Sequence, residues 1–216
     1  MVAANLEHRL MRSEVDESYL KEKIDRIESQ CRRAARIVQQ MKVFGRNVVD
    51  NEVCHLSIAV RDACELLASD IKNSGIKIVI EDNGSGEVAA SPTLIEQIVI
   101  NLLFNARDAI VEHRESLSGL RKIQVSVAAE RNIGLITVQD TGGGIPSDIM
   151  PRIFEPFFTT KAVGKGTGLG LAVCYGILRD LGGTIEVENV EDGAVFKIQI
   201  PLLTKSSREN VAMQLS

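Results

Sequence analysis

Three polar side chains recur along a segment whose other side is apolar. Asn101, Asn105 and Asp108 are spaced four and three residues apart, so a helix places them on one face. Two carboxamides and a carboxylate one turn apart suit a hard cation and phosphate oxygens, because Mg²⁺ takes few protein oxygens and completes its shell from water and phosphates. Taken alone, the pattern fits a phosphate-linked metal site and a solvated polar stripe equally well.

Asp140 precedes the first of two glycine clusters. It ends an expected strand, where its carboxylate can accept a hydrogen bond from an adenine amino group. Gly142 and Gly144 have no Cβ, so the backbone there can approach a purine ring closely. A capped turn is the alternative for this stretch taken alone.

The second cluster, GKGTGLG at residues 164–170, lies just before an apolar helix pattern. Its amides and the helix N-terminus form an anion site suited to phosphates. It differs from a Walker P-loop because Lys165 comes before the last glycines and not after them. Three phenylalanines between the clusters are expected to pack the base of a mobile lid whose residues 159–161 face the ligand: Phe154, Phe157 and Phe158.

The elements that must position these residues are helices and strands that follow one another in pairs. Helices are expected over residues 58–73, 91–112 and 171–181, with Ser57 capping the first and Ser91-Pro92 opening the second. Strands are expected over residues 76–80, 123–128, 135–139, 184–188 and 195–200. Paired strands predict a mixed or antiparallel sheet with helices on one face, a two-layer α/β sandwich. This order argues against a doubly wound dinucleotide fold.

A heptad seam precedes this α/β part. Seven residues step alternately by four and three: Leu20, Ile24, Ile27, Cys31, Ala34, Val38 and Met41. The spacing predicts a helix over residues 17–45 with one narrow apolar stripe. We expect this stripe to form a helical bundle with a second copy, giving a homodimer; a clamp on the globular part of the same chain is the alternative.

Composition places the chain among ordinary globular proteins. Its 216 residues carry a net charge of −4, which gives no electrostatic basis for binding nucleic acid or an acidic membrane surface. No apolar run reaches the ~20 residues of a membrane span, so no membrane contact is expected within this chain. The four cysteines, at 31, 54, 64 and 174, lack zinc-ligand spacing and are expected to be reduced thiols in a cytoplasmic protein.

Four consecutive boxes resemble the ATP-binding domain of sensor histidine kinases, in the superfamily that also holds gyrase, Hsp90 and MutL. IVINLLFNARDAI resembles the N box, DTGGGIP the first glycine box, IFEPFFTTK the F box and GKGTGLGLAV the second glycine box. The likeness covers residues 56–201, and RRAARIVQQMKVF is similar to the second helix of the family's dimerisation bundle. It implies a Bergerat-type ATP-binding fold preceded by a helical hairpin or coiled-coil segment.

The resemblance also implies ATP and Mg²⁺ as cofactors and a response-regulator receiver domain as partner. Asn105 corresponds to the Mg²⁺ ligand, Asn101 to its neighbour on the phosphate or metal side, and Asp140 to the acid that pairs with the adenine amino group. A wider set is expected to contact the nucleotide: Asn101, Asn105, Asp108, Asp140, Gly142, Gly144, Ile145, Phe154, Phe158, Thr160, Lys161, Gly166, Thr167, Gly168, Leu169 and Gly170.

Some members of the family carry Lys where this chain has Asp108. The positive charge at the γ-phosphate is therefore expected to come from Lys161 or Lys165. Both lysines join Asn101 and Asn105 as candidate catalytic residues.

Two departures from the wider superfamily bear on the reaction. ATP-hydrolysing relatives place a Glu four residues before the metal Asn to activate water, and here that position is Asn101, which cannot act as a general base. The pocket is therefore expected to hold ATP intact for transfer to another nucleophile. The family's acceptor histidine lies on the first bundle helix shortly before a proline, and none of His8, His55 and His113 fits that motif. We expect the acceptor to lie outside this chain, which then cannot autophosphorylate alone.

These observations divide the chain into a partial dimerisation segment (1–46), a linker (47–55), an ATP-binding catalytic domain (56–203) and a polar tail (204–216). The expected function is transfer of the ATP γ-phosphoryl group to a histidine absent from this chain, followed by signalling to a response regulator. Two alternatives are a free-standing serine kinase or anti-sigma regulator of the same fold, and an ATPase clamp of the gyrase or MutL class. The F box and heptad helix argue against the first, and Asn101 and the lack of a transducer domain against the second.

Overall fold

The computed structural model describes residues 19–24, 27, 52–113, 119–162 and 166–204. The chain divides into two units, Met1–Arg46 and Asn47–Ser216. In the first unit, residues 19–24 are helical, in line with the predicted helix, and the remainder of the heptad seam lies outside the described residues except for Ile27. The second unit holds all of the predicted site boxes.

Five strands of the second unit form one mixed sheet in the order β2-β4-β5-β7-β6. Their bounds are β2 (Lys77–Asp82), β4 (Lys122–Glu130), β5 (Ile133–Asp140), β6 (Thr184–Val190) and β7 (Gly193–Pro201). β2 and β4 are parallel, and each other neighbouring pair is antiparallel. A separate two-stranded ladder pairs β1 (Val53–His55) with β3 (Glu87–Ala89).

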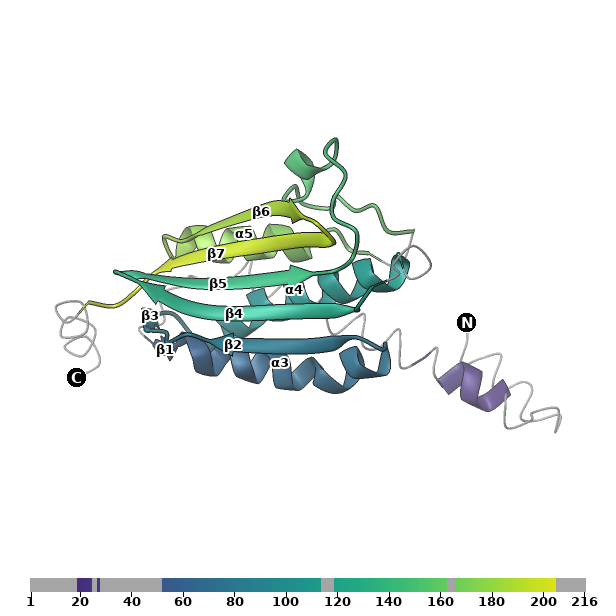
Figure 1. The fold of residues 1–216 in the computed structure, drawn as a ribbon, viewed down its shortest axis with the longest axis horizontal. Coiled ribbons are helices and arrows are strands. Elements are labelled where there is room, and N and C mark those ends of the chain that lie inside the picture. Colours follow the sequence, from purple (N-terminus) through teal and green to yellow (C-terminus); the bar gives the residue numbers. More distant parts are fainter. Residues whose placement is uncertain (1–18, 25–26, 28–51, 114–118, 163–165, 205–216) are drawn as a thin grey trace. The chain divides into compact units, whose positions relative to one another are not determined.

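Three helices lie together behind this sheet (Figure 1): α3 (Leu56–Asn73), α4 (Pro92–Glu112) and α5 (Gly170–Asp180). A short 3₁₀ turn, Met150–Arg152, lies in the long connection from β5 to α5 and has no counterpart in the sequence prediction. The predicted two-layer α/β sandwich with a mixed sheet is confirmed.

The core fills the space between the helices and the facing side of the sheet. Strict alternation along β4 and β5 turns one set of apolar side chains inward, and the register brings Ile136 opposite both Val127 and Ile198. The helices supply the other half of the core from their largest fully buried residues: Leu56, Ile71, Ile95, Ile98, Leu102, Leu103, Ile110, Ile177 and Leu178. One buried face per element is what a two-layer sandwich requires.

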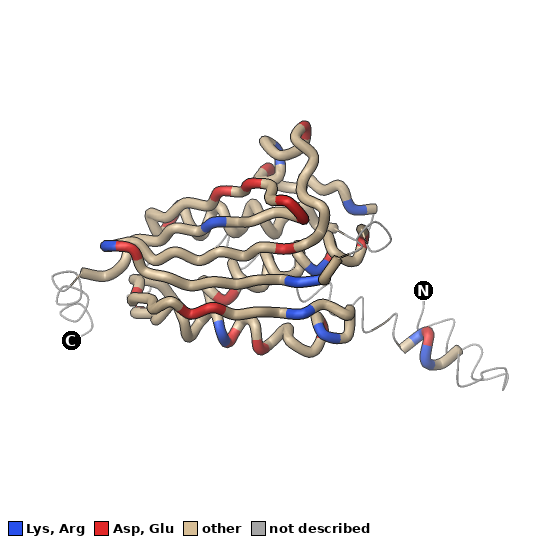
Figure 2. The backbone as a smooth tube through the Cα atoms, in the orientation of Figure 1, with Lys and Arg blue, Asp and Glu red and all other residues tan. Residues whose placement is uncertain are grey.

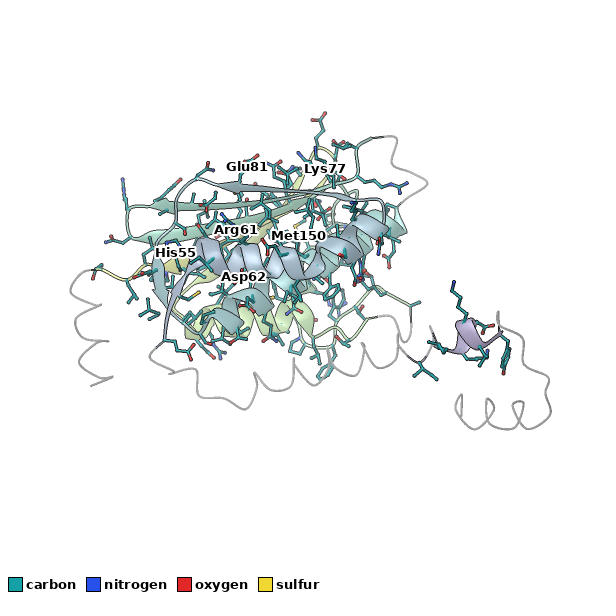
Figure 3. The ribbon with its side chains drawn as sticks, turned by 90° about the horizontal axis from the view of Figure 1, so that it is seen from below. His55, Arg61, Asp62, Lys77, Glu81 and Met150 are labelled. Atoms are coloured by element: carbon teal, nitrogen blue, oxygen red, sulfur yellow. The ribbon has the colours of Figure 1, made fainter. Side chains whose placement is uncertain are left out.

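The other side of the sheet is polar. Ser126 and Thr137, opposite each other on β4 and β5, share a hydrogen bond of 2.6 Å between their hydroxyl groups. Lys77 and Glu81 of β2 lie on the side of the sheet away from α3 (Figure 3). Residues of both charge signs are found on the sheet and the helices (Figure 2), in keeping with the small net charge.

The sequence predicted the start of α4 more accurately than the start of α3. Pro92 opens α4 directly after Ser91, as predicted. Ser57 is not the cap of α3: the helix begins at Leu56, two residues before the predicted start, with His55 at the N-cap position. The backbone amide of Ser57 donates instead to the hydroxyl of Ser85, at 2.9 Å, so the cap comes from a loop distant in sequence.

Among the described helices, no segment combines the length and the apolar character that crossing a lipid bilayer requires.

Two isoleucines test where the core ends. Ile198 on β7 is fully buried, whereas Ile133 at the start of β5 is 42% exposed. We expect Ile198→Ala to lower the free energy of unfolding by about 3 kcal/mol, because it leaves a cavity, and Ile133→Ala to lower it by less than about 1 kcal/mol. Urea denaturation followed by circular dichroism measures both values. Equal losses would contradict the assignment of the core.

Candidate active site

The polar face predicted on the helix over residues 91–112 lies on α4. Asn101 is nearly buried, with 9% of its surface exposed, while Asn105 and Asp108 are half-buried further along the helix. On its other sides α4 packs into the core through residues such as Ile98 and Leu102, which fixes the direction of the polar face. The spacing read from the sequence therefore gives a real shared face.

Asn101 connects α4 to the start of α5. Its Nδ2 donates to the carbonyl of Gly170 at 3.3 Å and lies 3.7 Å from the Sγ of Cys174. Cys174 is fully buried, and burial raises the pKa of its thiol to about 12. The carboxamide of Asn101 thus links Gly170, the first residue of α5, to α4.

Asp108 is paired with two cations. Its Oδ2 accepts from the Nζ of Lys161 at 2.6 Å, and its Oδ1 accepts from the guanidinium of its neighbour Arg107 at 2.6 Å. Burial by itself would raise the pKa of Asp108, but the charge and hydrogen bond of Lys161, followed by those of Arg107, outweigh it and lower the pKa. Lys161 therefore lies beside the polar face of α4, while Lys165 lies outside the described residues.

Asp140 is buried at the end of β5, with 5% of its surface exposed. Its Oδ1 accepts from the backbone amide of Gly142 at 2.7 Å. Burial raises the pKa of this carboxyl, opposed by the backbone amides of Gly142 and Ala194 and by the charge of His113. A buried acceptor held by two backbone amides has a defined direction, which hydrogen-bond recognition of a ligand requires.

The first glycine loop lies against α4 and β6. A Cβ on Gly142 would be 2.6 Å from the Cβ of Ala109 on α4, so only glycine permits this approach. Gly144 adopts φ +80°, a backbone conformation that other residues rarely take. Ile145 is held by the side chain of Asn189, whose Oδ1 accepts from its amide and whose Nδ2 donates to its carbonyl, both at 2.8 Å.

The F box and the second glycine box are joined at Phe157 and Gly168. The amide of Phe157 donates to the carbonyl of Gly168 at 2.8 Å, and both residues have positive φ values. A Cβ on Gly168 would be 2.3 Å from the carbonyl carbon of Phe157, which excludes other residues at this position. A Cβ on Gly166 would similarly lie 2.4 Å from the hydroxyl oxygen of Thr159. Gly166 and Gly168, which the sequence analysis singled out, thus pack directly against Thr159 and Phe157 of the F box.

The three F box phenylalanines do not pack as one group. The ring of Phe154 lies 6.0 Å from the ring of Tyr175, and Phe158 lies under the guanidinium of Arg152 at 4.5 Å. Phe157 is 74% exposed, which differs from the expectation that all three pack the base of the lid. Its amide, fixed by Gly168, directs the side chain outward.

Several of the sequence-predicted residues lie on α4 or contact it. Asp108, Lys161, Asn101, Gly170 and Gly142 all contact this helix or belong to it. The hydroxyl of Thr167 accepts from the amide of Leu169 at 3.3 Å, while Thr160 is exposed in the lid. The nucleotide contacts of these residues stay predictions.

Sequence reasoning missed several residues of the site. Arg107 could have been identified, because a cation next to Asp108 is visible in the sequence. Asn189 of β6 and Gly193 of β7 contact the first glycine loop from the β6–β7 hairpin. They lie more than 40 residues from the loop and carry no local signal. Their position follows only from the strand order, which brings β7 beside β5.

Within the described ranges, no cluster of three or more His, Cys, Asp or Glu side chains has the arrangement of a metal site. A divalent cation at α4 would therefore need oxygens from a ligand as well as from the amide of Asn105.

The sequence matches a known family over residues 90–204, more than half of its length. That family is described as histidine kinase-, DNA gyrase B- and HSP90-like ATPases. The chain belongs to this family, as the four boxes and the two-layer sandwich indicate.

Its relatives are sensor kinases. The two-component sensor PprA of Pseudomonas aeruginosa is 35% identical over 206 residues, which cover 94% of this chain and 22% of PprA. The sensor kinase CckA of Brucella abortus is 39% identical over 199 residues, covering 86% of this chain and 21% of CckA. The chain thus spans about a fifth of the length of these relatives.

Solved histidine kinase structures share the fold. The catalytic domain of the histidine kinase ThkA matches with a TM-score of 0.61 and 34% identity, over 69% of this chain and 94% of that domain. A structure of ThkA in complex with the response regulator TrrA matches with a TM-score of 0.68 and 28% identity, over 93% of this chain and 56% of that one.

Two glycine substitutions test the fastening of the lid. Gly168→Ala forces a Cβ into the backbone of Phe157 at a positive φ, and we expect it to weaken ATP binding by about tenfold or more. Gly176→Ala, in α5, is the matched control because a Cβ there meets no atom within 4 Å. It should leave binding unchanged and raise stability by about 0.5–1 kcal/mol. Calorimetric titration and thermal melting measure these effects; equal binding by both variants would refute the lid contact.

The pKa values of the two aspartates should be shifted in opposite directions. Asp108 has a lowered pKa, so its carboxylate contributes stability above pH 3.8 that is lost as the pH falls through its folded-state pKa. Asp140 has a raised pKa, so its ionisation opposes folding as the pH rises above 3.8. Carbon-13 NMR of the carboxyl groups, assigned with Asp108→Asn and Asp140→Asn, should give midpoints below and above 3.8, respectively. Midpoints in the reverse order would contradict the site electrostatics.

Proposed function

We propose that this chain is the catalytic, ATP-binding part of a two-component sensor histidine kinase and passes the γ-phosphoryl group of ATP to a histidine. The convergence of three separate loops on one face of α4 is the observation that carries the proposal. The first glycine loop approaches at Gly142, the lid at Lys161 and the second glycine box at Gly170. One helix can then face the base, the metal and the phosphates of a single bound nucleotide.

The adenine end of the site is the loop after β5. The buried carboxylate of Asp140 accepts a hydrogen bond from the amino group of adenine, and the loop backbone from Gly142 to Ile145 lies along the ring. Because two backbone amides already hold this carboxylate, its remaining acceptor sites are oriented before the ligand arrives. This pre-orientation favours adenine over a purine that carries no amino group at that position.

The phosphate end lies between α4 and the lid. Asn105 fits a Mg²⁺ ligand, because a half-buried neutral carboxamide supplies one oxygen and leaves the remaining positions to phosphates and water. Asp108 fits this role less well, since both of its oxygens are engaged by cations. Mg²⁺ would neutralise phosphate charge here. Lys161 exchanges its pairing with Asp108 for an oxygen of the γ-phosphate, and the amides of residues 166–170 bind the other phosphates.

The reaction is transfer and not hydrolysis. Asn101 has no basic group, and its amide is engaged with the carbonyl of Gly170, so it does not activate water. A histidine nitrogen supplied from outside this domain attacks the γ-phosphorus. The bond from phosphorus to the bridging oxygen breaks, and ADP leaves with the electron pair.

The partners that we propose are those of a two-component sensor histidine kinase. A response regulator is the next phosphoryl acceptor, supported by the ThkA complex with TrrA. The segment over residues 17–45 forms the homodimer through its heptad seam, and residues 56–203 form the catalytic domain. The chain acts in the cytoplasm, where ATP and the response regulator are present.

The test uses the purified chain and a separately purified helical bundle that carries an acceptor histidine. We expect ATP·Mg²⁺ to bind, phosphate release to stay well below the ~1 s⁻¹ of ordinary enzymes, and radiolabel from γ-labelled ATP to appear on the bundle in acid-labile form. Asn105→Ala should abolish the Mg²⁺-dependent part of the binding. Rapid hydrolysis that Asn101→Ala removes would instead identify an ATPase, and no transfer to any histidine would refute the proposal.

A further inference from the structure

The β6–β7 hairpin contacts the first glycine loop through one side chain near the end of β6. The carboxamide of Asn189 accepts from the amide of Ile145 and donates to its carbonyl, each at 2.8 Å. Neighbouring residues in an antiparallel sheet exchange the same two hydrogen bonds through their backbones. Asn189 therefore takes the place of a strand neighbour for a residue that lies beyond the end of β5.

The same hairpin holds the other end of the loop. The carbonyl of Asp192 accepts from the amide of Gly143 at 2.9 Å. A Cβ on Gly193, the first residue of β7, would lie 2.1 Å from the backbone oxygen of Asp140 and 2.8 Å from its Oδ1, so β7 approaches Asp140 as closely as a backbone can. The amide of Ala194 also donates to the carboxylate of Asp140. From Asp140 to Ile145, the loop is thus held by residues 189–194.

Gly144 shows how tightly the loop fits. Its φ of +80° directs the position of an absent Cβ toward Asn189, at 3.0 Å from Oδ1. Because the loop has no ladder of its own, its amides depend on these partners for their hydrogen bonds. Loss of the carboxamide would free Ile145 and the adjoining glycines while leaving β5 and β7 paired.

We infer that Asn189 is a positioning residue for purine recognition: it holds the loop in the one conformation in which Asp140 and the glycine backbone bind adenine. The inference rests on the proposed role of Asp140. It concerns base affinity and base selectivity, and it assigns Asn189 no contact with the phosphates.

Among side chains of the length of Asn189, only that of asparagine supplies both a hydrogen-bond donor and an uncharged acceptor. Alanine removes the donor and the acceptor, whereas aspartate keeps an acceptor for the amide of Ile145 but places negative charge beside its carbonyl. Asn189→Asp should therefore be no better than Asn189→Ala. Glu191→Ala is the matched control, because Glu191 lies exposed in the turn two residues after Asn189, and the hydrogen bonds of Gly143 and Ile145 go to Asp192 and Asn189 instead.

Calorimetric titration with ATP, ADP and GTP, each with Mg²⁺, tests the inference. Asn189→Ala should weaken ATP and ADP by the same factor, about fivefold to tenfold, and leave the weaker GTP binding unchanged, so that the ratio of ATP to GTP affinity falls. Glu191→Ala should match the wild type. The melting temperature of both variants should stay within about 3 °C of the wild type.

Three results would overturn the inference: unchanged ATP affinity in Asn189→Ala, equal losses for ATP and GTP, or full rescue by Asn189→Asp. Asp140→Asn separates the inference from the proposed function. Loss of ATP affinity in Asp140→Asn with none in Asn189→Ala overturns only the role of Asn189. Retained ATP affinity in Asp140→Asn overturns the adenine role of Asp140 and this inference with it.

Discussion

The packing of α4 is the constraint on which the rest of the site depends. The helix is buried on its apolar sides, so its polar face cannot rotate without exposing residues such as Ile98 and Leu102 to water. This burial fixes the side of α4 on which Asn105 and Asp108 lie, and the ion pair with Lys161 further holds Asp108. The glycine loops and the lid are then located by contacts to a rigid helix, which suits a site that must hold a polyphosphate in one geometry.

Much of this arrangement could be predicted from the sequence because its signals are local. The Ser91-Pro92 start, the four-and-three spacing on α4 and the paired strands are all determined within a few residues of chain. Gly144 and Gly168, which the sequence analysis singled out, both adopt a positive φ, a conformation that glycine takes at low cost. Local signals therefore predicted the fold class and the shared polar face of α4.

What could not be predicted depends on residues brought together from distant parts of the chain. The cap of α3 comes from Ser85 and not from Ser57, and the partner of Ile145 is Asn189, 44 residues away. The outward direction of Phe157 depends on its bond to Gly168, which no periodicity reveals. Such pairings exist only once the strand order is known.

The buried thiols have a practical consequence. Burial raises the pKa of Cys174 to about 12 and of Cys54 and Cys64 to about 11, so at neutral pH only about one in 10⁴ or fewer of these groups is a thiolate. Alkylating reagents and peroxide act on thiolates, and these three side chains are shielded by the core as well. Residues 52–204 therefore give a low labelling background, on which a single cysteine placed at the exposed position of Thr160 would be the main reactive thiol.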